Sequence, residues 1–427
     1  MTQPTNIHTC TTDPPLISDT TDSTVSDSAT LSTPLILLFA IACGLSVANM
    51  YYIHPMLNVI ATDLHMDAAM SGSVITVTQL CYALGLLLLV PLGDRVPRRL
   101  LITGQMLLSV ICLLFTALAS GSFSFWIGIG AMGGLAVVAQ TIVAAAASLS
   151  SPTQRGRTVG TVTSAIVIGI LSARVIAGWL TDWSGWRSVY LCSAILLFIV
   201  ALLIYRYFPV KAVSPSTCPY APRLSYSELV WSTLQLFREL PILRIRAVLA
   251  MLTFAAFSTL WTTLVFPLST APFTWSHSAI GMLGIAGLAG ALAASRAGRW
   301  ADRGWMHRTS GGALVLLALS WLFTWQMYDH VWWLLVGIIL LDLAVQAVHV
   351  TSQSMILAAR PEAGSRLTGG YMIFYSIGSA TGSLTATWVY AAHGWNGVCY
   401  LGLGYSLAAL LFWSWTWRTQ KDRHTEA

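Results

Sequence analysis

The sequence has very little charge. Of its 427 residues, only 9% are Asp, Glu, Lys or Arg, whereas 56% are hydrophobic. Soluble globular proteins carry about 25% charged residues, so a soluble domain with this composition could not keep its surface hydrated. The shortage of charge excludes a soluble fold and predicts that most of the surface faces a second, apolar solvent.

Several catalytic signatures are also missing. The chain has only two lysines, Lys211 and Lys421, and no Gly-x4-Gly-Lys-Ser/Thr motif, which disfavours ATP hydrolysis. No His-Glu-x-x-His or Gly-x-Ser-x-Gly supports an intramembrane hydrolase. The seven cysteines contain no Cys-x-x-Cys pair, so they are expected to be small apolar packing residues. We therefore expect no enzyme, no metal site and no cofactor.

What the sequence does have is long apolar blocks. Each is close to the 20 or so residues that a helix needs to cross a bilayer, and alternating strand patterns are absent. The blocks predict an all-α membrane protein with twelve transmembrane helices, at 34–57, 68–92, 100–120, 123–149, 158–181, 187–208, 245–270, 278–297, 310–328, 331–358, 367–392 and 397–417.

The basic residues predict the orientation of these helices. All 22 Lys and Arg except Arg174 and Arg187 lie in or beside alternate loops and the tails. By the positive-inside rule those loops are cytoplasmic, and so are both termini. This distribution explains the net charge of +6 without any nucleic-acid partner. Residues 1–33 hold no Lys or Arg, so we expect a disordered cytoplasmic tail and no signal peptide.

Short signatures recur at one offset and divide the chain into two halves. Gly185-Trp186 recurs 209 residues later as Gly394-Trp395, and Gly72 recurs as Gly281 by the same step. Because six spans return the chain to its starting side, the halves would have the same orientation, which is one known transporter plan. We expect an N-terminal half at 34–208, a cytoplasmic central loop with an amphipathic helix at 209–244, a C-terminal half at 245–417 and a cytoplasmic tail at 418–427.

Two loops carry a family signature. After the second block the chain reads Gly93-Asp94-Arg95-Val96-Pro97-Arg98-Arg99, and after the eighth Gly298-Arg299-Trp300-Ala301-Asp302-Arg303-Gly304. Both resemble the Gly-x-x-x-Asp-Arg-x-Gly-Arg-Arg/Lys loop of the major facilitator superfamily, and the chain looks most like its drug-exporter-like branch. The resemblance covers nearly the whole chain. It implies that these loops pair charges that bias inward-open and outward-open states, through Asp94, Arg95, Arg98, Arg99, Gly298, Asp302 and Arg303.

The fifth block resembles the antiporter motif of the same superfamily, Gly-x8-Gly-x3-Gly-Pro-x2-Gly-Gly. Here Gly160, Gly169 and Gly178 keep the small residues, which predicts close helix packing. The Gly-Pro pair is replaced by Ala173-Arg174, so a proline kink is lost and a cation is gained. The departure weakens the resemblance to proton-coupled drug exporters.

Two charges lie deep within the predicted spans, and such residues are functional candidates because the bilayer core penalises them. Arg174 is in the fifth block and Asp342 in the tenth. Counted from the outer ends of their spans, their depths differ by only about 6 Å at 1.5 Å per residue. The resemblance places these two spans near each other. We expect Arg174 and Asp342 either to share a substrate or to form a fixed structural ion pair.

Other polar side chains gather on the same spans. Asp342, Gln346, His349 and Gln353 share one helix face, which must look inward because lipid would not tolerate it. Gln140 is the repeat counterpart of His349. Aromatic, amide and hydroxyl groups on other spans would complete a pocket for a small amphipathic molecule. The predicted substrate and coupling residues are Asp342, Arg174, Gln346, His349, Gln79, Gln140, Asn49, Tyr52, His54, Trp261 and Tyr375.

These features favour a monomeric bacterial inner-membrane carrier. We expect alternating access driven by a proton gradient, with efflux of a small organic molecule as the first hypothesis. Uptake of a small metabolite is the alternative, and a non-transporting membrane sensor or receptor is an alternative of another class. Its expected partners are the substrate and the lipid bilayer.

Overall fold

The computed structural model describes residues 31–66, 68–151, 154–209, 226–293, 306–360 and 363–425, and within these ranges it contains helices and no β-strand. The all-α fold predicted from the composition is confirmed. The first half of the chain forms α1 (Thr33–Tyr51), α2 (Ile53–Asp63), α3 (Ala68–Leu88), η1 (Val90–Asp94), α4 (Arg98–Ala117), α5 (Ser122–Leu135), α6 (Val138–Leu149), α7 (Arg155–Ser184) and α8 (Trp186–Tyr207).

The second half repeats this plan after a short connecting helix, α9. Its elements are α9 (Tyr226–Glu239), α10 (Pro241–Thr263), α11 (Val265–Ser269), α12 (His277–Ala293), α14 (Met306–Trp325), η3 (Gln326–Tyr328), α15 (Val331–Ala359) and α16 (Gly364–Thr425). The last of these is two helices joined at Gly394, whose backbone leaves the helical region.

Ten helical stretches of the described chain are long and apolar enough to cross a membrane. The predicted blocks at 367–392 and 397–417 both fall within one of them, on either side of Gly394. The block at 278–297 holds a shorter apolar helix, His277–Gly290. The chain is a multi-pass membrane protein, and the count of twelve crossings stays a prediction.

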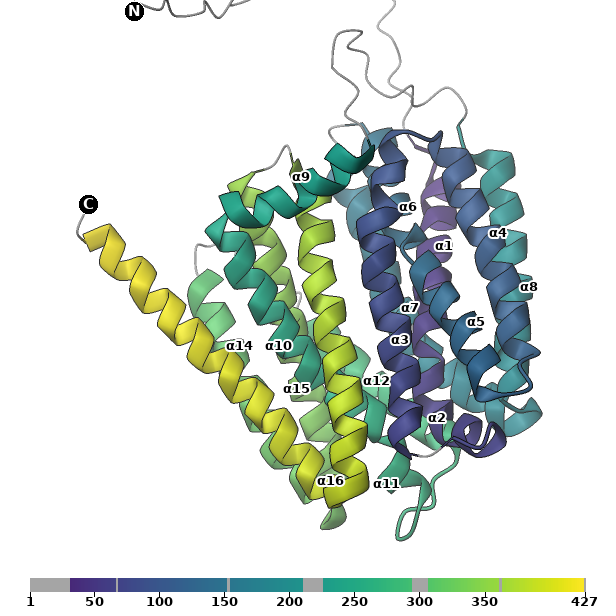
Figure 1. Ribbon diagram of the computed structural model, residues 1–427, viewed down its shortest axis with the longest axis vertical. Helices are drawn as coiled ribbons and strands as arrows, with labels where there is room; N and C mark the ends of the chain where they lie inside the picture. Colours follow the sequence, from purple (N-terminus) through teal and green to yellow (C-terminus); the bar gives the residue numbers. More distant parts are fainter. Residues whose placement is uncertain are drawn as a thin grey trace, which may run out of the picture.

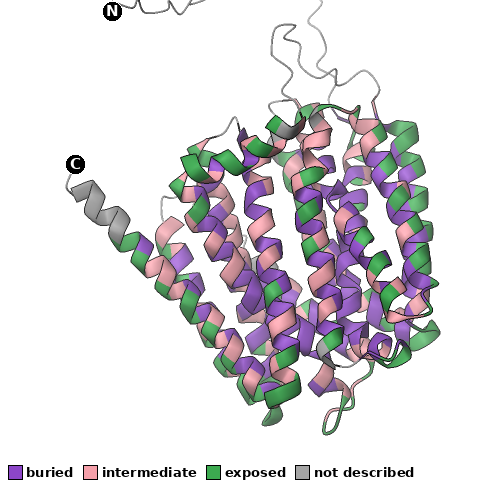
Figure 2. Ribbon diagram, viewed as in Figure 1, coloured by how far each residue is buried: buried purple, intermediate pink, exposed green. Residues whose placement is uncertain are grey.

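The two halves stand side by side with α9 crossing one end of the bundle (Figure 1). We call that end the α9 face and the other end, where α11 lies, the opposite face. The halves meet along two lines, where α3 packs on α16 and where α7 packs on α12. Buried residues fill the interior between the helices, and exposed residues cover the outer surfaces (Figure 2). Many of the exposed side chains are large and apolar, which suits contact with lipid.

The sequence repeat marks equivalent positions in the two halves. Gly185 and Gly394 both have positive φ, 80° and 61°, which favours glycine because it has no Cβ atom. The tryptophan that follows each is buried, and its indole N–H donates a hydrogen bond within its own half. A Cβ atom at Gly72 would overlap Thr387 of α16, and one at Gly281 would overlap the carbonyl oxygen of Arg174. Gly72 therefore lies at the contact between α3 and α16, and its repeat counterpart Gly281 lies at the contact between α7 and α12.

Helix α9 ties the halves together at its face. Near its start, the Tyr226 hydroxyl donates to the carbonyl oxygen of Leu88 in α3, at 2.5 Å. At its end, Phe237 packs against Phe374 of α16, with ring centroids 5.2 Å apart. Arg360, which follows α15, pairs with Glu239 at 2.6 Å. The central connection thus contacts both halves through its amphipathic helix.

Candidate functional site

Arg174 lies in α7 at the boundary between the two halves, and only 1% of it is exposed. Its guanidinium carbon is 3.6 Å from the ring centroid of Trp261 in α10, with Phe257 and Tyr51 rings at 5.6 and 5.8 Å. Among the described residues, none of its three side-chain nitrogens has a hydrogen-bond partner. The aromatic rings contact the cation, but they do not supply acceptors for its N–H groups.

Asp342 lies in α15 and is equally buried, with 2% exposed. Its Oδ2 has no hydrogen-bond partner within the described part of the chain. None of the ion pairs there joins it to Arg174. The fixed ion pair that the sequence offered as one alternative is therefore not formed in this conformation.

A stripe of glycines on α12 brings these two charges to one place. A Cβ atom at Gly284 would lie 3.4 Å from Cβ of Arg174, and one at Gly287 would lie 3.0 Å from Oδ2 of Asp342. Residues three apart are neighbours on a helix surface. The Cβ atom added at Gly287 would also lie 3.2 Å from Cζ2 of the Trp261 ring. Thus α12 separates α7 from α15 by little more than its own backbone, and Arg174, Trp261 and Asp342 surround one small region.

Aromatic side chains extend this region towards the α9 end of the bundle. The hydroxyls of Tyr51 in α1 and Tyr375 in α16 are hydrogen-bonded at 3.1 Å, which joins the two halves. His54 stacks on Tyr51, with ring centroids 5.5 Å apart. On the other side, Nδ1 of His349 and the Tyr371 hydroxyl are hydrogen-bonded at 3.1 Å. The structure thus brings together most of the predicted site: Arg174, Asp342, Trp261, Tyr375, His54 and His349.

The remaining predicted residues are placed elsewhere, except that Gln79 of α3 lies close to the Tyr51 hydroxyl. Asn49 faces α8, where its Oδ1 accepts a hydrogen bond from Ser193 at 2.6 Å, so it holds two helices of one half together. Tyr52 is buried at the end of α1, Gln79 is buried in α3, and Gln346 is half-buried on α15. Gln140 lines a separate cavity near the α9 face. Across the described ranges, no three His, Cys, Asp or Glu side chains could together hold a metal ion.

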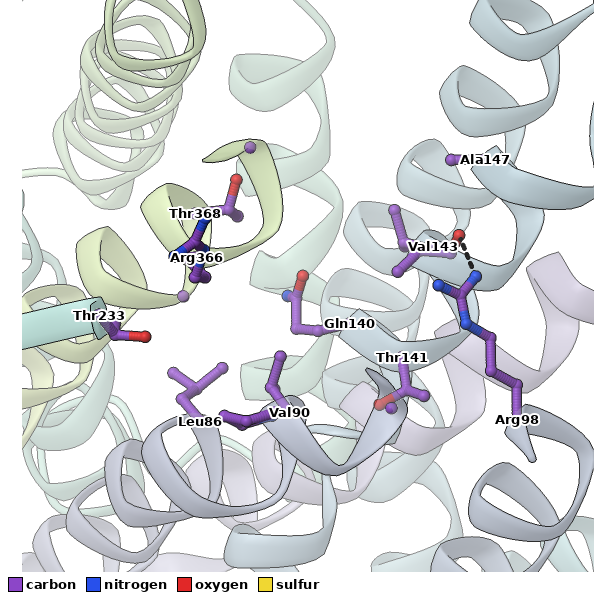
Figure 3. Close-up of a pocket in the computed structure, with 15 residues that line it drawn as sticks. Leu86, Val90, Arg98, Gln140, Thr141, Val143, Ala147, Thr233, Arg366 and Thr368 are labelled. Carbon is purple, nitrogen blue, oxygen red and sulfur yellow. Dashed lines mark hydrogen bonds between the residues drawn. The ribbon is translucent and has the colours of Figure 1, made fainter. Parts of the chain in front are cut away.

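That cavity, of about 230 Å³, opens between the halves beneath α9. Residues of α3, η1 and α6 line it from the N-terminal half, and the start of α16 and Thr233 of α9 complete it. Gln140 points into the space from one side and Arg366 lies across from it, whereas Arg98 turns away (Figure 3). We call this cavity, which lies between the halves and next to α9, the vestibule.

Two of the predicted gating residues, Arg98 and Arg99, contact their own half. Arg98 donates to the carbonyl oxygen of Ala144 at 3.0 Å and to the Ser148 hydroxyl, which joins α4 to α6. The guanidinium of Arg99 lies 4.2 Å from the Tyr205 ring centroid in α8. Arg95 is exposed. Gly298, Asp302, Arg303 and the side chain of Asp94 lie outside the described residues. Of the packing glycines, Gly169 meets Gly44 of α1, Gly178 meets His277, and Gly160 faces open space.

At the opposite face the halves are held together by a carboxylate that the sequence analysis did not single out. Asp182, near the end of α7, accepts hydrogen bonds from the backbone N–H groups of His277 and Ser278, at 3.2 and 2.7 Å. These are orphan donors of the first turn of α12, where a negative charge is also favoured by the helix dipole. Nearby, Asn58 of α2 donates to the Ser269 hydroxyl of α11 at 2.8 Å. This end of the half-interface is therefore closed.

Replacing Asp182 with alanine is expected to loosen this closure. The cap and its dipole interaction contribute about 0.5–2 kcal/mol in comparable helices, which shifts a two-state population roughly 2- to 30-fold. Spin labels on cysteines introduced at the exposed residues Ser120 and Asp329, in a background without native cysteines, would report the separation of the halves. We expect the distance distribution to gain a longer component.

The matched control is Asp63→Ala. Asp63 is on the same face and pairs with Arg187 at 2.6 Å, but both residues belong to the N-terminal half. Its loss should leave the distance distribution unchanged. If Asp182→Ala behaved like Asp63→Ala, the cap would have no part in closing the opposite face.

A second buried cation among the described residues was also missed from the sequence. Arg246, near the start of α10, is 1% exposed and donates to the Ser310 hydroxyl of α14 at 3.1 Å. Ser310 in turn is hydrogen-bonded to Thr351 of α15 at 3.1 Å. In the sequence, Arg246 is one of the basic residues in or beside the loops, and proximity to a loop does not distinguish a charge that sets topology from a buried one.

The comparison with known families agrees with this architecture. The model for the Major Facilitator Superfamily matches residues 39–306 and 246–427. The chain belongs to the Major Facilitator Superfamily. As a superfamily member it is a transporter rather than an enzyme. The drug-exporter-like branch inferred from the loop motifs stays a prediction.

Named relatives support the assignment at the level of transport. The chain is 44% identical over 388 residues to the uncharacterized transporter YgaY of Escherichia coli O157:H7, covering 91% of this chain and 96% of the relative. It is 29% identical over 379 residues to the probable transporter SCO4007 of Streptomyces coelicolor, covering 87% and 86%.

Solved structures share the superfamily fold with this chain. A mutant of the nucleoside transporter NupG matches with a TM-score of 0.70 and 14% identity, covering 89% of this chain and 99% of that one. The human organic anion transporter MFSD10 matches with a TM-score of 0.65 and 17% identity, covering 88% and 98%. At these identities the likeness shows the fold alone.

Proposed function

We propose that this superfamily member is a secondary active transporter that carries a small organic solute by alternating access, coupled to protons. The observation that carries the proposal is the pair of buried charges at the half-boundary, Arg174 from the N-terminal half and Asp342 from the C-terminal half. Among the described residues, the guanidinium nitrogens of Arg174 and Oδ2 of Asp342 have no hydrogen-bond partner. Burying such groups without partners costs several kcal/mol, so their retention is best explained by a ligand and a proton that bind there transiently.

The two ends of the interface between the halves differ, and this difference supports alternating access. The opposite face is closed by the contacts of Asp182 with α12 and of Asn58 with α11, whereas next to α9 the vestibule leaves space between the halves. We propose that the α9 face and both termini are cytoplasmic and that the membrane is the bacterial inner membrane, in keeping with the basic loops at that end. The structure then corresponds to an inward-facing state.

Replacing Asp342 with asparagine tests the coupling. The amide cannot exchange a proton, so we expect the variant to let solute equilibrate but not accumulate. The purified protein would be placed in proteoliposomes, incubated with a small-molecule extract of bacterial cells with and without a pH gradient, and the contents analysed by mass spectrometry. Uptake dependent on an acidic exterior indicates cotransport, and faster loss from preloaded vesicles under the same gradient indicates exchange and hence efflux.

The control for this variant is Asp329→Asn, which makes the same chemical change at an exposed aspartate on the opposite face. It should retain the gradient dependence of the unmodified protein. Unchanged accumulation by Asp342→Asn would refute a coupling role for Asp342. Failure of the unmodified protein to move any solute would argue against transport itself.

A further inference from the structure

We infer that the transported solute is a small organic anion bearing one carboxylate, held by Arg174 and accompanied by one proton on Asp342. The inference rests on the proposed function, because it specifies the cargo of the same site. It concerns the charge class of the cargo and the number of protons that move with it, both of which follow from the arrangement of three side chains.

Arg174 has the chemistry of an anion site. Its guanidinium stays charged, so it cannot escape burial by losing a proton. Trp261, Phe257 and Tyr51 contact the cation through their rings, but ring faces cannot satisfy N–H donors directed along the guanidinium edge. A planar carboxylate can accept two parallel hydrogen bonds from that edge. The three guanidinium nitrogens therefore need a hydrogen-bond acceptor that the described part of the chain does not supply.

A cationic cargo is disfavoured at the same place. A positive group brought to Asp342 would come close to Arg174, since both side chains border the Gly284–Gly287 stretch of α12 and Trp261. Repulsion between like charges is strong in a buried site, where little water screens it. The arginine in α7 thus selects against the cation that a lone membrane aspartate would accept.

The charge balance of the site requires one proton to bind together with the anion. With an ionised Asp342 and no ligand, the buried charges of Arg174 and Asp342 sum to zero. An added carboxylate would leave one uncompensated negative charge, which a buried site resists. One proton bound by Asp342 restores neutrality and is released when the anion leaves. Anion and proton therefore bind together, and the loaded site moves no net charge.

Among the described residues, Asp342 is the only buried acidic side chain, and His54, which is also near Arg174, is engaged with the ring and the carbonyl oxygen of Tyr51. Arg174 faces Asp342 from α7, and α10 and α12 present Trp261, Gly287 and Gly290. The stretch 309–325 of α14 contains no titratable side chain. His349 lies two turns further along α15 and is engaged with Tyr371 of α16. Cotransport in one direction follows, so an inward proton gradient drives uptake. This favours the uptake alternative over the efflux hypothesis.

The test uses the full-length protein in proteoliposomes with a small-molecule extract of bacterial cells as the probe. Each solute that accumulates is identified by mass spectrometry and sorted by its charge at the external pH. We expect carboxylate monoanions. Their uptake should rise with an acidic exterior and should not change when a potassium gradient with valinomycin imposes a membrane potential of either sign.

Arg174→Gln is the matching variant, and it should lower uptake of those anions roughly 100-fold or more, the usual consequence of removing one partner of a buried charged contact. Arg418→Gln removes the same charge from an exposed position of α16 and should have no effect. The melting temperature of each variant, recorded alongside, shows whether the fold is retained, and the charge class and voltage independence are measured on the unmodified protein.

Three results would overturn the inference while leaving transport intact. The first is accumulation of cations or neutral molecules. The second is accumulation of zwitterions without a requirement for protons, which would mean that Arg174 and Asp342 each bind one end of the cargo. The third is full uptake by a folded Arg174→Gln variant. Absence of any accumulated solute would instead count against the proposed function.

Discussion

Replacing Arg174 with methionine is expected to stabilise the protein and to abolish transport. The guanidinium is buried without hydrogen-bond partners among the described residues, so the folded state bears the cost of its desolvation. Methionine fills a similar volume without charge and packs well against the Trp261 and Phe257 rings that surround this position. Apolar replacement of whole buried ion pairs or triads has raised stability by about 1–4 kcal/mol in other proteins. Asp342, left without its cation, can bind a proton and become neutral.

The measurement pairs thermal unfolding of the purified protein with uptake into proteoliposomes. We expect a higher melting temperature together with uptake at background. Arg246→Met provides the contrast, because Arg246 is equally buried but donates to Ser310 and lies away from the half-boundary. That variant should lose the α10–α14 hydrogen bond without the same loss of transport. A lower melting temperature for Arg174→Met would show that the cation is structural.

Replacing Gly281 with alanine should strongly destabilise the contact between the halves. A Cβ atom there would overlap the carbonyl oxygen of Arg174 and lie 3.4 Å from Cα of Val175, so α7 and α12 must move apart. Backbone atoms cannot rotate away as a flexible side chain can, and overpacking of this kind costs about 1–3 kcal/mol, occasionally more. The shift would also displace Arg174 from Trp261. We therefore expect a lower melting temperature and a large loss of transport.

Gly404→Ala is the control for helix propensity. Gly404 lies in α16 with nothing within 4 Å of the added Cβ atom, so alanine should stabilise the helix by roughly 0.5–1 kcal/mol. If the melting temperature fell for Gly281→Ala and rose for Gly404→Ala, the loss of stability would come from the inter-helix contact rather than from the backbone. If Gly281→Ala were as stable as Gly404→Ala, the close approach of α7 and α12 would be refuted.

The fold could be predicted because a bilayer constrains the composition and length of each short stretch of sequence that crosses it. The length of each apolar block, the distribution of basic residues and the repeated glycines all depend on short stretches of sequence. The two deep charges could be found for the same reason, since an ionisable residue in a span is visible without any tertiary contact. Gly185 and Gly394 illustrate the limit of this visibility. The repeat marked them as equivalent positions between predicted helices, but it did not reveal the positive φ that both share.

What could not be predicted depends on contacts between distant segments. Asp182 caps a helix that begins 95 residues later, and nothing in the sequence near it indicates that partner. Asn49 was expected in the pocket but turns to Ser193, because one helix face can point to either of two neighbours. The hydrogen bond between Tyr51 and Tyr375 joins residues 324 apart. Helical spacing identifies a shared face but not the helix that faces it.

The glycine stripe of α12 also bears on how the halves move. Helices ordinarily interlock because side chains of one form ridges that fit the grooves of the other. At Gly281 and Gly284 the contact with α7 lacks such ridges, as does the contact with α15 at Gly287 and Gly290. One helix can then slide or tilt over the other without any side chain changing rotamer. The energy barrier between the two states would be set mainly by the caps and hydrogen bonds at the ends of the bundle. The helix contacts in the interior would add little to that barrier.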